Sequence, residues 1–162
     1  MIEEMKRIQP ILHSPRYRDW LRRIDELEAG RIYCRHGLPH LLDVARIAAL
    51  LAVERGAPYA RDQIYAAALL HDLGRLEQYT TGAPHAQAGL PMARELLRET
   101  AFTAREQQQI LHAIGRHRTG DAPDSLAQLL HEADHASRMC FACAAADTCY
   151  WPEARRNATV FL

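Results

Sequence analysis

One stretch of this sequence is apolar on nearly every side of the helix that it predicts. Between about Arg61 and Leu73, most positions carry small or aliphatic side chains, namely Ile64, Ala66, Ala67, Ala68, Leu69 and Leu70. A helix that is apolar around its whole circumference is stable only where neighbouring elements enclose it. The stretch therefore predicts a helix at the centre of a bundle, and Gly74 is expected to stop it.

Signals for helix starts and stops recur along the rest of the chain, and no segment shows a convincing strand pattern. Ser14 and Pro15 predict the cap and first turn of a helix over about 14–29, and Thr103 with Glu106 forms the pattern of a capping box. Further helices are expected over about 39–56, 85–98, 103–117 and 125–143, with loops at 79–84 and 120–124 and an irregular tail at 147–162. Pro91 is expected to kink or split its helix.

Length and charge balance set the broad class of protein. A chain of 162 residues fits one domain, so we expect a compact all-α bundle over residues 1–162. Its 20 Lys and Arg residues equal its 20 Asp and Glu residues, which leaves no net field to attract a nucleic acid duplex or a membrane. Met1–Lys6 has no apolar signal core, and the runs 47–53 and 66–70 are too short to cross a bilayer. We therefore expect a cytoplasmic protein with reduced cysteines.

The adjacent pair His71–Asp72 stands at the end of the predicted central helix. Burying either side chain unpaired costs free energy, and a bound metal ion removes much of that cost. The alternative is a hydrogen-bonded His–Asp pair in the core without a metal. Further candidate ligands stand on separate predicted helices or at their edges, namely His40, His85, His117 and Asp134. A helical bundle assembles a metal cage in this way, and imidazole with carboxylate suits Fe, Mn, Zn or Ni.

The order and spacing of these residues, from about Arg35 to Arg138, resemble those of the HD-domain phosphohydrolases, a family named for its His–Asp pair. The resemblance implies a helical HD fold whose core covers about 35–138. It implies a first metal ion held by His40, His71, Asp72 and Asp134. Family members with two ions add two histidines, which match His85 and His117. Two divalent transition metal ions are therefore expected, with Asp72 as the bridge between them.

The resemblance also implies the chemistry. A metal-activated hydroxide would hydrolyse a phosphate ester or anhydride, with a nucleotide as the leading class of small phosphorylated substrate. Arg75 follows the His–Asp turn and is expected to act with Asp72 in catalysis by neutralising charge in the transition state. His36, Arg116 and Arg118 are expected to contact substrate. The sequence indicates no particular oligomeric state.

Two segments refine the resemblance. Residues 114–120 are similar to a segment of the HD-type diadenosine tetraphosphate hydrolases, although Arg118 departs from that pattern. Residues 134–143 are similar to a segment of small bacterial HD proteins. Other members of the superfamily suggest two alternatives, a di-iron oxygenase and a non-enzymatic binding or sensor module. The complete set of matched ligands favours an enzyme over the non-enzymatic module.

The cysteines form a second candidate site. Cys140 and Cys143 have the Cys-x2-Cys spacing of zinc and iron–sulfur half-sites, and Cys149 follows shortly after. The fourth ligand would be Cys34, far upstream. A metal or redox site is one interpretation of these four residues. The other is that Cys140 and Cys143 pack as small apolar residues on an Ala-rich helix face.

Overall fold

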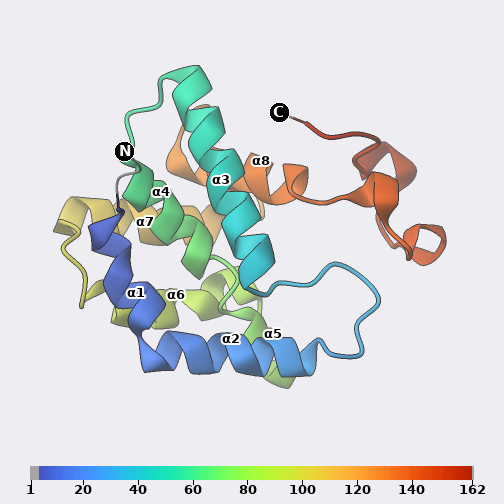
Figure 1. Cartoon of the computed structure of the whole chain (residues 1–162), viewed down its shortest axis with the longest axis horizontal. Coiled ribbons are helices and arrows are strands. Elements are labelled where there is room, and N and C mark those ends of the chain that lie inside the picture. The colour runs from blue at the N-terminus through green and yellow to red at the C-terminus, as the bar shows by residue number, and fades with distance from the viewer. Residues whose placement is uncertain (1–3, 162) are drawn as a thin grey trace.

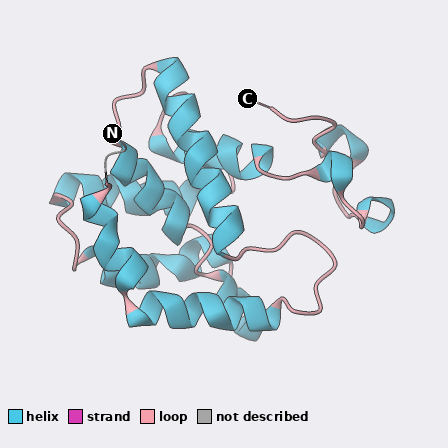
Figure 2. Ribbon diagram, in the orientation of Figure 1, coloured by secondary structure: helices cyan, strands magenta, loops and turns pink. Residues whose placement is uncertain are grey.

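The computed structural model describes residues 4–161, and this part of the chain contains helices and loops but no strand (Figures 1 and 2). The all-α class expected from the sequence is confirmed. The first residues of the stretch Met1–Lys6 lie outside the described range. The α-helices are α1 (Gln9–His13), α2 (Pro15–Leu27), α3 (Leu38–Arg55), α4 (Arg61–Leu70), α5 (Arg75–Thr81), α6 (His85–Leu97), α7 (Ala104–Arg116) and α8 (Leu126–Ala136). Short 3-10 turns are η1 (Lys6–Ile8), η2 (Cys140–Ala142), η3 (Ala146–Thr148) and η4 (Glu153–Arg155).

The helix at the centre of the bundle is α4, as its all-round apolar pattern predicts. It packs against α3, α7 and α8, which enclose it (Figure 1). Ala66, Ala67, Ala68, Leu69 and Leu70 are all fully buried. Removing one of these leucine side chains would cost about 2–5 kcal/mol of stability. None of the helices in the described part of the chain combines the length and hydrophobicity that a membrane crossing needs.

Local capping sets several helix ends where the sequence predicts them. The Ser14 side chain accepts a hydrogen bond from the backbone of Tyr17 at the start of α2. Thr103 and Glu106 form a complete capping box at the start of α7. At the end of α3, Gly56 adopts a left-handed conformation with φ of 63°, which glycine tolerates without a steric penalty.

The turn after α4 differs from its expectation. The helix ends at Leu70, and residues 71–74 form a turn into α5, a helix that replaces much of the loop expected at 79–84. Gly74 caps the start of α5 instead of stopping α4. A Cβ at Gly74 would overlap the backbone of His85 and lie 2.5 Å from the backbone nitrogen of Gly89. Glycine therefore allows this turn to lie directly on α6.

Two other helices depart from the expected pattern. The helix α6 runs unbroken through Pro91, so the proline does not split it. The last α-helix ends at Ala136 rather than near Cys143, and the Ser137 hydroxyl donates to the carbonyl of Asp134 at that end. The chain beyond it has only short 3-10 turns and extends to one side of the bundle, near the loop that joins α2 to α3 (Figure 1).

Candidate metal centre

Six side chains that the sequence singles out meet at one place inside the bundle. His71 and Asp72 form the turn after α4 and are 0% and 1% exposed. The others come from four helix ends: His40 from the first turn of α3, His85 from the start of α6, His117 from the end of α7 and Asp134 from the last turn of α8. The structure thus brings all six predicted metal ligands together.

The first group comprises His40, His71, Asp72 and Asp134, each of which offers one ligand atom within 4.8 Å of the others. Nε2 of His40 lies 3.2 Å from Oδ1 of Asp134 and 3.5 Å from Oδ2 of Asp72. Nε2 of His71 lies 3.1 Å from the same Asp72 oxygen. Two imidazoles and two carboxylates at this spacing are a donor set for a divalent transition metal.

The second group comprises Asp72, His85 and His117. Nε2 of His85 lies 3.4 Å from Oδ1 of Asp72, and Nε2 of His117 lies 3.9 Å from that oxygen. The two histidine nitrogens are 3.1 Å apart. Oδ1 of Asp72 therefore faces this group while Oδ2 faces the first, so the carboxylate lies between the two groups.

Hydrogen bonds hold three of the rings so that Nε2 faces the centre. Carbonyl oxygens only accept, so Nδ1 of His71 donates to Ala68 at 2.7 Å and Nδ1 of His117 donates to Ile114 at 2.6 Å. Nδ1 of His40 lies 3.3 Å from the Ser137 hydroxyl. Such contacts fix the tautomer that leaves Nε2 available to a metal.

Two buried polar atoms at the centre also fit a metal site. Nε2 of His71 and Oδ2 of Asp72 are buried and have no hydrogen-bond partner in the protein. A buried polar atom without a partner costs about 1–3 kcal/mol. A cation between these atoms would remove that cost, so the residues present fit the metal that the HD resemblance implies.

The charge states of the site suit metal binding. Burial lowers the pKa of His85 to about 3 and that of His117 to about 4, so both rings are neutral at pH 7. Burial opposes ionisation of Asp72, but the positive charge of His71 and the nearby His40 and Arg75 hold its pKa well below the usual value. Burial also opposes ionisation of Asp134, and the neighbouring histidines again outweigh it. Burial opposes the charge of His71, but Asp72 and Asp134 raise its pKa above the usual value. Metals bind neutral imidazoles and ionised carboxylates, so a bound ion would displace the proton of His71.

Two arginines contact the centre. Nε of Arg75 lies 3.1 Å from Oδ1 of Asp72, so the predicted catalytic cation touches the central carboxylate. Arg138 was not selected from the sequence. Its guanidinium donates to Nε2 of His40 at 2.9 Å and lies 3.4 Å from Oδ1 of Asp134. The one indication of this role in the sequence is that Arg138 stands four residues after Asp134, because residues at that spacing are neighbours on a helix.

His36 lies behind the centre and is buried in a small polar network. Its Nδ1 bonds to Glu28, and its backbone N–H donates to the same carboxylate at 2.8 Å. The Tyr79 hydroxyl donates to Glu28 as well. The ring of His36 packs edge-on against His40, with centroids 5.8 Å apart. The sequence does not predict the contact between Glu28 and His36, because no rule of residue spacing relates the end of α2 to the loop that follows it.

The two other predicted substrate contacts lie on the surface near the end of α7. Arg116 and Arg118 are both exposed. Arg118 borders a small cavity of about 20 Å³ that His117 and Asp134 also line. Trp151 and Arg155 from the C-terminal segment complete one side of that cavity. A ligand approaching the metal centre from this side would pass Arg118.

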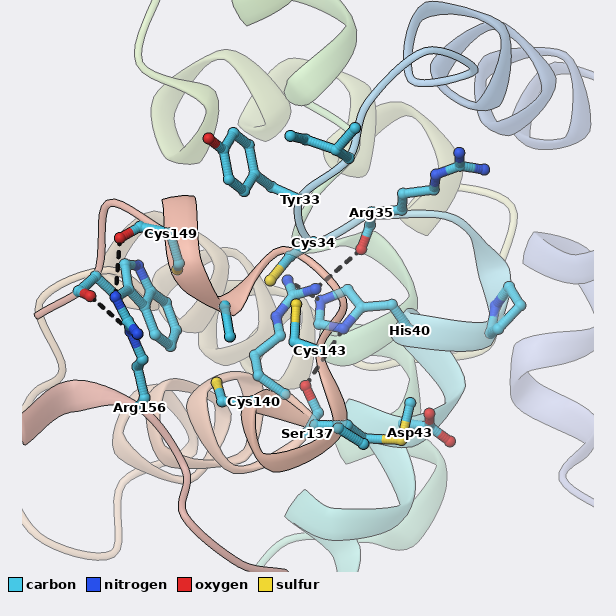
Figure 3. Close-up of a pocket in the computed structure, with 17 residues that line it drawn as sticks. Tyr33, Cys34, Arg35, His40, Asp43, Ser137, Cys140, Cys143, Cys149 and Arg156 are labelled. Atoms are coloured by element: carbon cyan, nitrogen blue, oxygen red, sulfur yellow. Dashed lines mark hydrogen bonds between the residues drawn. The ribbon is translucent and has the colours of Figure 1, made fainter. Parts of the chain in front are cut away.

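All four cysteines line one cavity of about 330 Å³ next to the centre (Figure 3). His40 and Arg138 border the same cavity. Cys140 and Cys143 do not lie on a helix face, because α8 ends before them. The interpretation that they pack on such a face is therefore wrong.

Comparison with known proteins agrees with this arrangement. The family model described as HD domain matches residues 37–139. An uncharacterized protein of Clostridium beijerinckii is 34% identical over 157 residues, which cover 97% of this chain and 99% of that protein. Ribonuclease Y of Chloroflexus aurantiacus is 32% identical over 112 residues, which cover 69% of this chain but only 20% of that enzyme.

A solved structure resembles the whole fold. It is the crystal structure of a predicted HD superfamily hydrolase from an uncultured Thermotogales bacterium. The match has a TM-score of 0.62 at 24% identity and covers 95% of this chain and 87% of the other. The fold, the buried His–Asp pair and the matches in sequence lead to one conclusion: this chain belongs to the HD domain family.

Proposed function

We propose that the protein is a metal-dependent phosphohydrolase that cleaves a phosphate ester or anhydride of a small molecule at a two-ion centre. One observation carries the proposal. The two carboxylate oxygens of Asp72 face different groups of histidines, 3.5 Å from His40 on one side and 3.4 Å from His85 on the other. A site built for a single ion would not need the second group.

Each residue has a distinct part in this proposal. His40, His71 and Asp134 would hold one ion, His85 and His117 the other, and Asp72 both. When bound, paired divalent ions supply Lewis acidity and a water of lowered pKa. His85 and His117 are neutral at pH 7 and would not repel these ions.

Arginines near the centre support a phosphorylated substrate. Arg75 contacts Asp72 and is positioned to pair with a phosphoryl oxygen beside the carboxylate. Arg118 and Arg155 border the small cavity at His117 and Asp134. Guanidinium groups bind phosphate oxygens in bidentate pairs, so they would neutralise the charge that develops during hydrolysis.

We favour a nucleotide as the substrate. The ribonuclease Y relatives are named for cleavage of RNA, whose bonds are phosphodiesters between nucleotides. Trp151 places an indole ring beside the cavity at Asp134, where it packs against His135 and Arg155. The likeness of residues 114–120 to diadenosine tetraphosphate hydrolases stays a prediction, and dinucleoside polyphosphates belong among the substrates to test.

The test couples metal analysis of freshly purified protein to a phosphate-release screen. Its substrates are nucleotides, dinucleoside polyphosphates, sugar phosphates and a short single-stranded RNA. We expect about two divalent ions per chain at the His–Asp centre and hydrolysis of at least one nucleotide. Asp72→Asn should lose both these ions and the hydrolysis. Asp19→Asn is the matched control, because Asp19 is exposed on α2 and pairs only with Arg22. Wild-type turnover in Asp72→Asn, or iron with oxygen uptake and no hydrolysis, would overturn the proposal.

A further inference from the structure

Four cysteines from separate loops and turns surround one space beside the metal centre. Cys34 lies in the loop between α2 and α3, Cys140 begins η2, Cys143 follows it, and Cys149 follows η3. All four line the cavity of about 330 Å³, and their sulfur atoms stand around it in Figure 3. Each is a free thiol and partly buried. The fold thus gathers every cysteine of the chain at one place.

The C-terminal segment that carries three of them has almost no hydrophobic core of its own. The buried core cluster of the bundle contains no residue after Ala133 within the described part of the chain. Met139, Phe141 and Tyr150 are 68%, 49% and 70% exposed. A segment of this kind commonly needs a metal site or a disulfide to hold one conformation. None of the four cysteines forms a disulfide, and a metal site is a cross-link that they can form.

The surroundings of the cavity carry positive charge. Three arginines border it together with the cysteines, namely Arg35, Arg138 and Arg156, against one carboxylate, that of Asp43. Burial raises the pKa of Cys34, Arg138 lowers it, and the other three thiols raise it further. The other three sulfurs therefore lie within electrostatic reach of Cys34. Thiolates in a metal site would bring several negative charges into this cavity, and the arginines would balance them.

We propose that Cys34, Cys140, Cys143 and Cys149 bind an iron–sulfur cluster of the 4Fe–4S type. Such clusters take four cysteine thiolates, and a Cys-x2-Cys pair is a frequent part of the ligand set. A net negative cluster fits a cavity lined by three arginines. The site is separate from the His–Asp centre and does not depend on the hydrolase activity proposed above.

The spacing of the sulfurs favours a cluster over a single zinc ion. A tetrahedral zinc site with bonds of about 2.3 Å places its sulfurs about 3.8 Å apart. Among residues 4–161, no three cysteine sulfurs lie within 4.8 Å of one another. In a cluster each thiolate binds a different iron, so the sulfurs stand farther apart. The open cavity between the four cysteines provides room for the inorganic core.

The position of the cluster would tie the C-terminal segment to the metal centre. Arg138 bonds to the carbonyl of Arg35 at 2.9 Å, next to Cys34, and also to His40. Tyr33 donates to the carbonyl of Thr148 at 3.0 Å, next to Cys149. These contacts join the same two segments that the cysteines join. A cluster would hold Arg138 and Trp151 beside the His–Asp centre.

The experiment uses the full chain, purified without oxygen. We expect broad visible absorption, about four irons and four acid-labile sulfides per chain beyond the metal of the His–Asp centre, and a paramagnetic signal after reduction with dithionite. Sulfide is the decisive measurement, because the His–Asp centre holds none. Zinc in place of iron without sulfide would overturn the cluster, as would four thiols that react freely in protein without bound metal.

Variants separate the two sites. Cys140→Ser and Cys143→Ser should lose the sulfide and the visible absorption, whereas Asp147→Ala, an exposed neighbour in the same segment, should keep both. Asp72→Asn should keep the sulfide while it loses the metal of the His–Asp centre. If the serine variants fail to fold, the sulfide content of the wild-type protein still decides the proposal. Failure of phosphate release would leave this result unchanged.

Discussion

The rings of His71 and His117 are held in the same way, each by a hydrogen bond from Nδ1 to the backbone carbonyl three residues before it. Their centroids lie 5.0 Å apart. Each ring therefore presents Nε2 towards Asp72 from the end of its own helix. The bundle itself orients these ligands, and a bound ion would need little rearrangement.

The second group of ligands can be removed without removing the first. In His85→Ala and in His117→Ala, we expect the loss of about one ion per chain, because the first four ligands remain. Metal analysis of each purified variant checks this. His112→Ala is the control, because His112 is exposed and bonds only to Asp121. Unchanged stoichiometry in both variants would show that neither histidine holds an ion and would reduce them to substrate contacts.

The close approach of Gly74 to α6 predicts a strong effect of a single methyl group. Gly74→Ala places a Cβ against the backbone of His85 and Gly89, and overpacking of this kind costs about 1–3 kcal/mol. We expect a lower free energy of unfolding in urea and a reduced metal content. In Gly115→Ala the new Cβ would find no atom nearer than 3.7 Å, so that variant should be as stable as wild type or more so.

The capping box of α7 predicts a stability effect without an effect on catalysis. Thr103→Ala removes the hydroxyl that accepts from the backbone of Glu106, at a cost of about 1 kcal/mol. Thermal unfolding should shift down by about 2–4 °C. Thr103→Ser keeps the hydroxyl and should restore most of the loss. A large fall in the activity of Thr103→Ala would show that the cap also supports the site.

The low pKa values of His85 and His117 predict that the metal-free protein is less stable in acid. Their folded pKa values of about 3 and 4 lie below the unfolded value of 6.5. The unfolded chain therefore takes up more protons as pH falls below about 6.5, and stability falls with it, by up to about 1.4 kcal/mol per pH unit for each histidine. Urea unfolding between pH 7 and 5 measures this. A His85→Gln, His117→Gln double variant should show a flatter dependence.

Arg75 should contribute to the rate and not to metal binding. In Arg75→Ala we expect a fall in kcat of about 100-fold on the best nucleotide substrate, with unchanged metal content. Arg75→Lys should recover part of the rate, because it keeps the charge but not the fork of donors. Arg22→Ala, on the exposed face of α2, is the control. Loss of the metal in Arg75→Ala would instead indicate that the arginine positions Asp72.

Local patterns alone were sufficient for much of the fold. The all-round apolar stretch of α4, the Ser14 cap and the Thr103–Glu106 capping box act over three or four neighbouring residues, so they can be read without tertiary contacts. The helix α5 was missed because only Leu76 in it is buried, which leaves no repeating apolar pattern. The last helix is shorter than the sequence predicts. The apolar residues after Ala136 continue the helical pattern, but they do not pack on the core of the bundle.

The residue types of the candidate site were present in the sequence, but their geometry was not. A His–Asp pair at the end of a buried helix indicates a metal, since burial of both side chains is otherwise costly. That the two oxygens of Asp72 face opposite groups depends on how the ends of four helices and one turn meet. The same is true of Glu28 behind His36 and of Cys34 beside Cys140, because packing alone brings segments together that are distant along the chain.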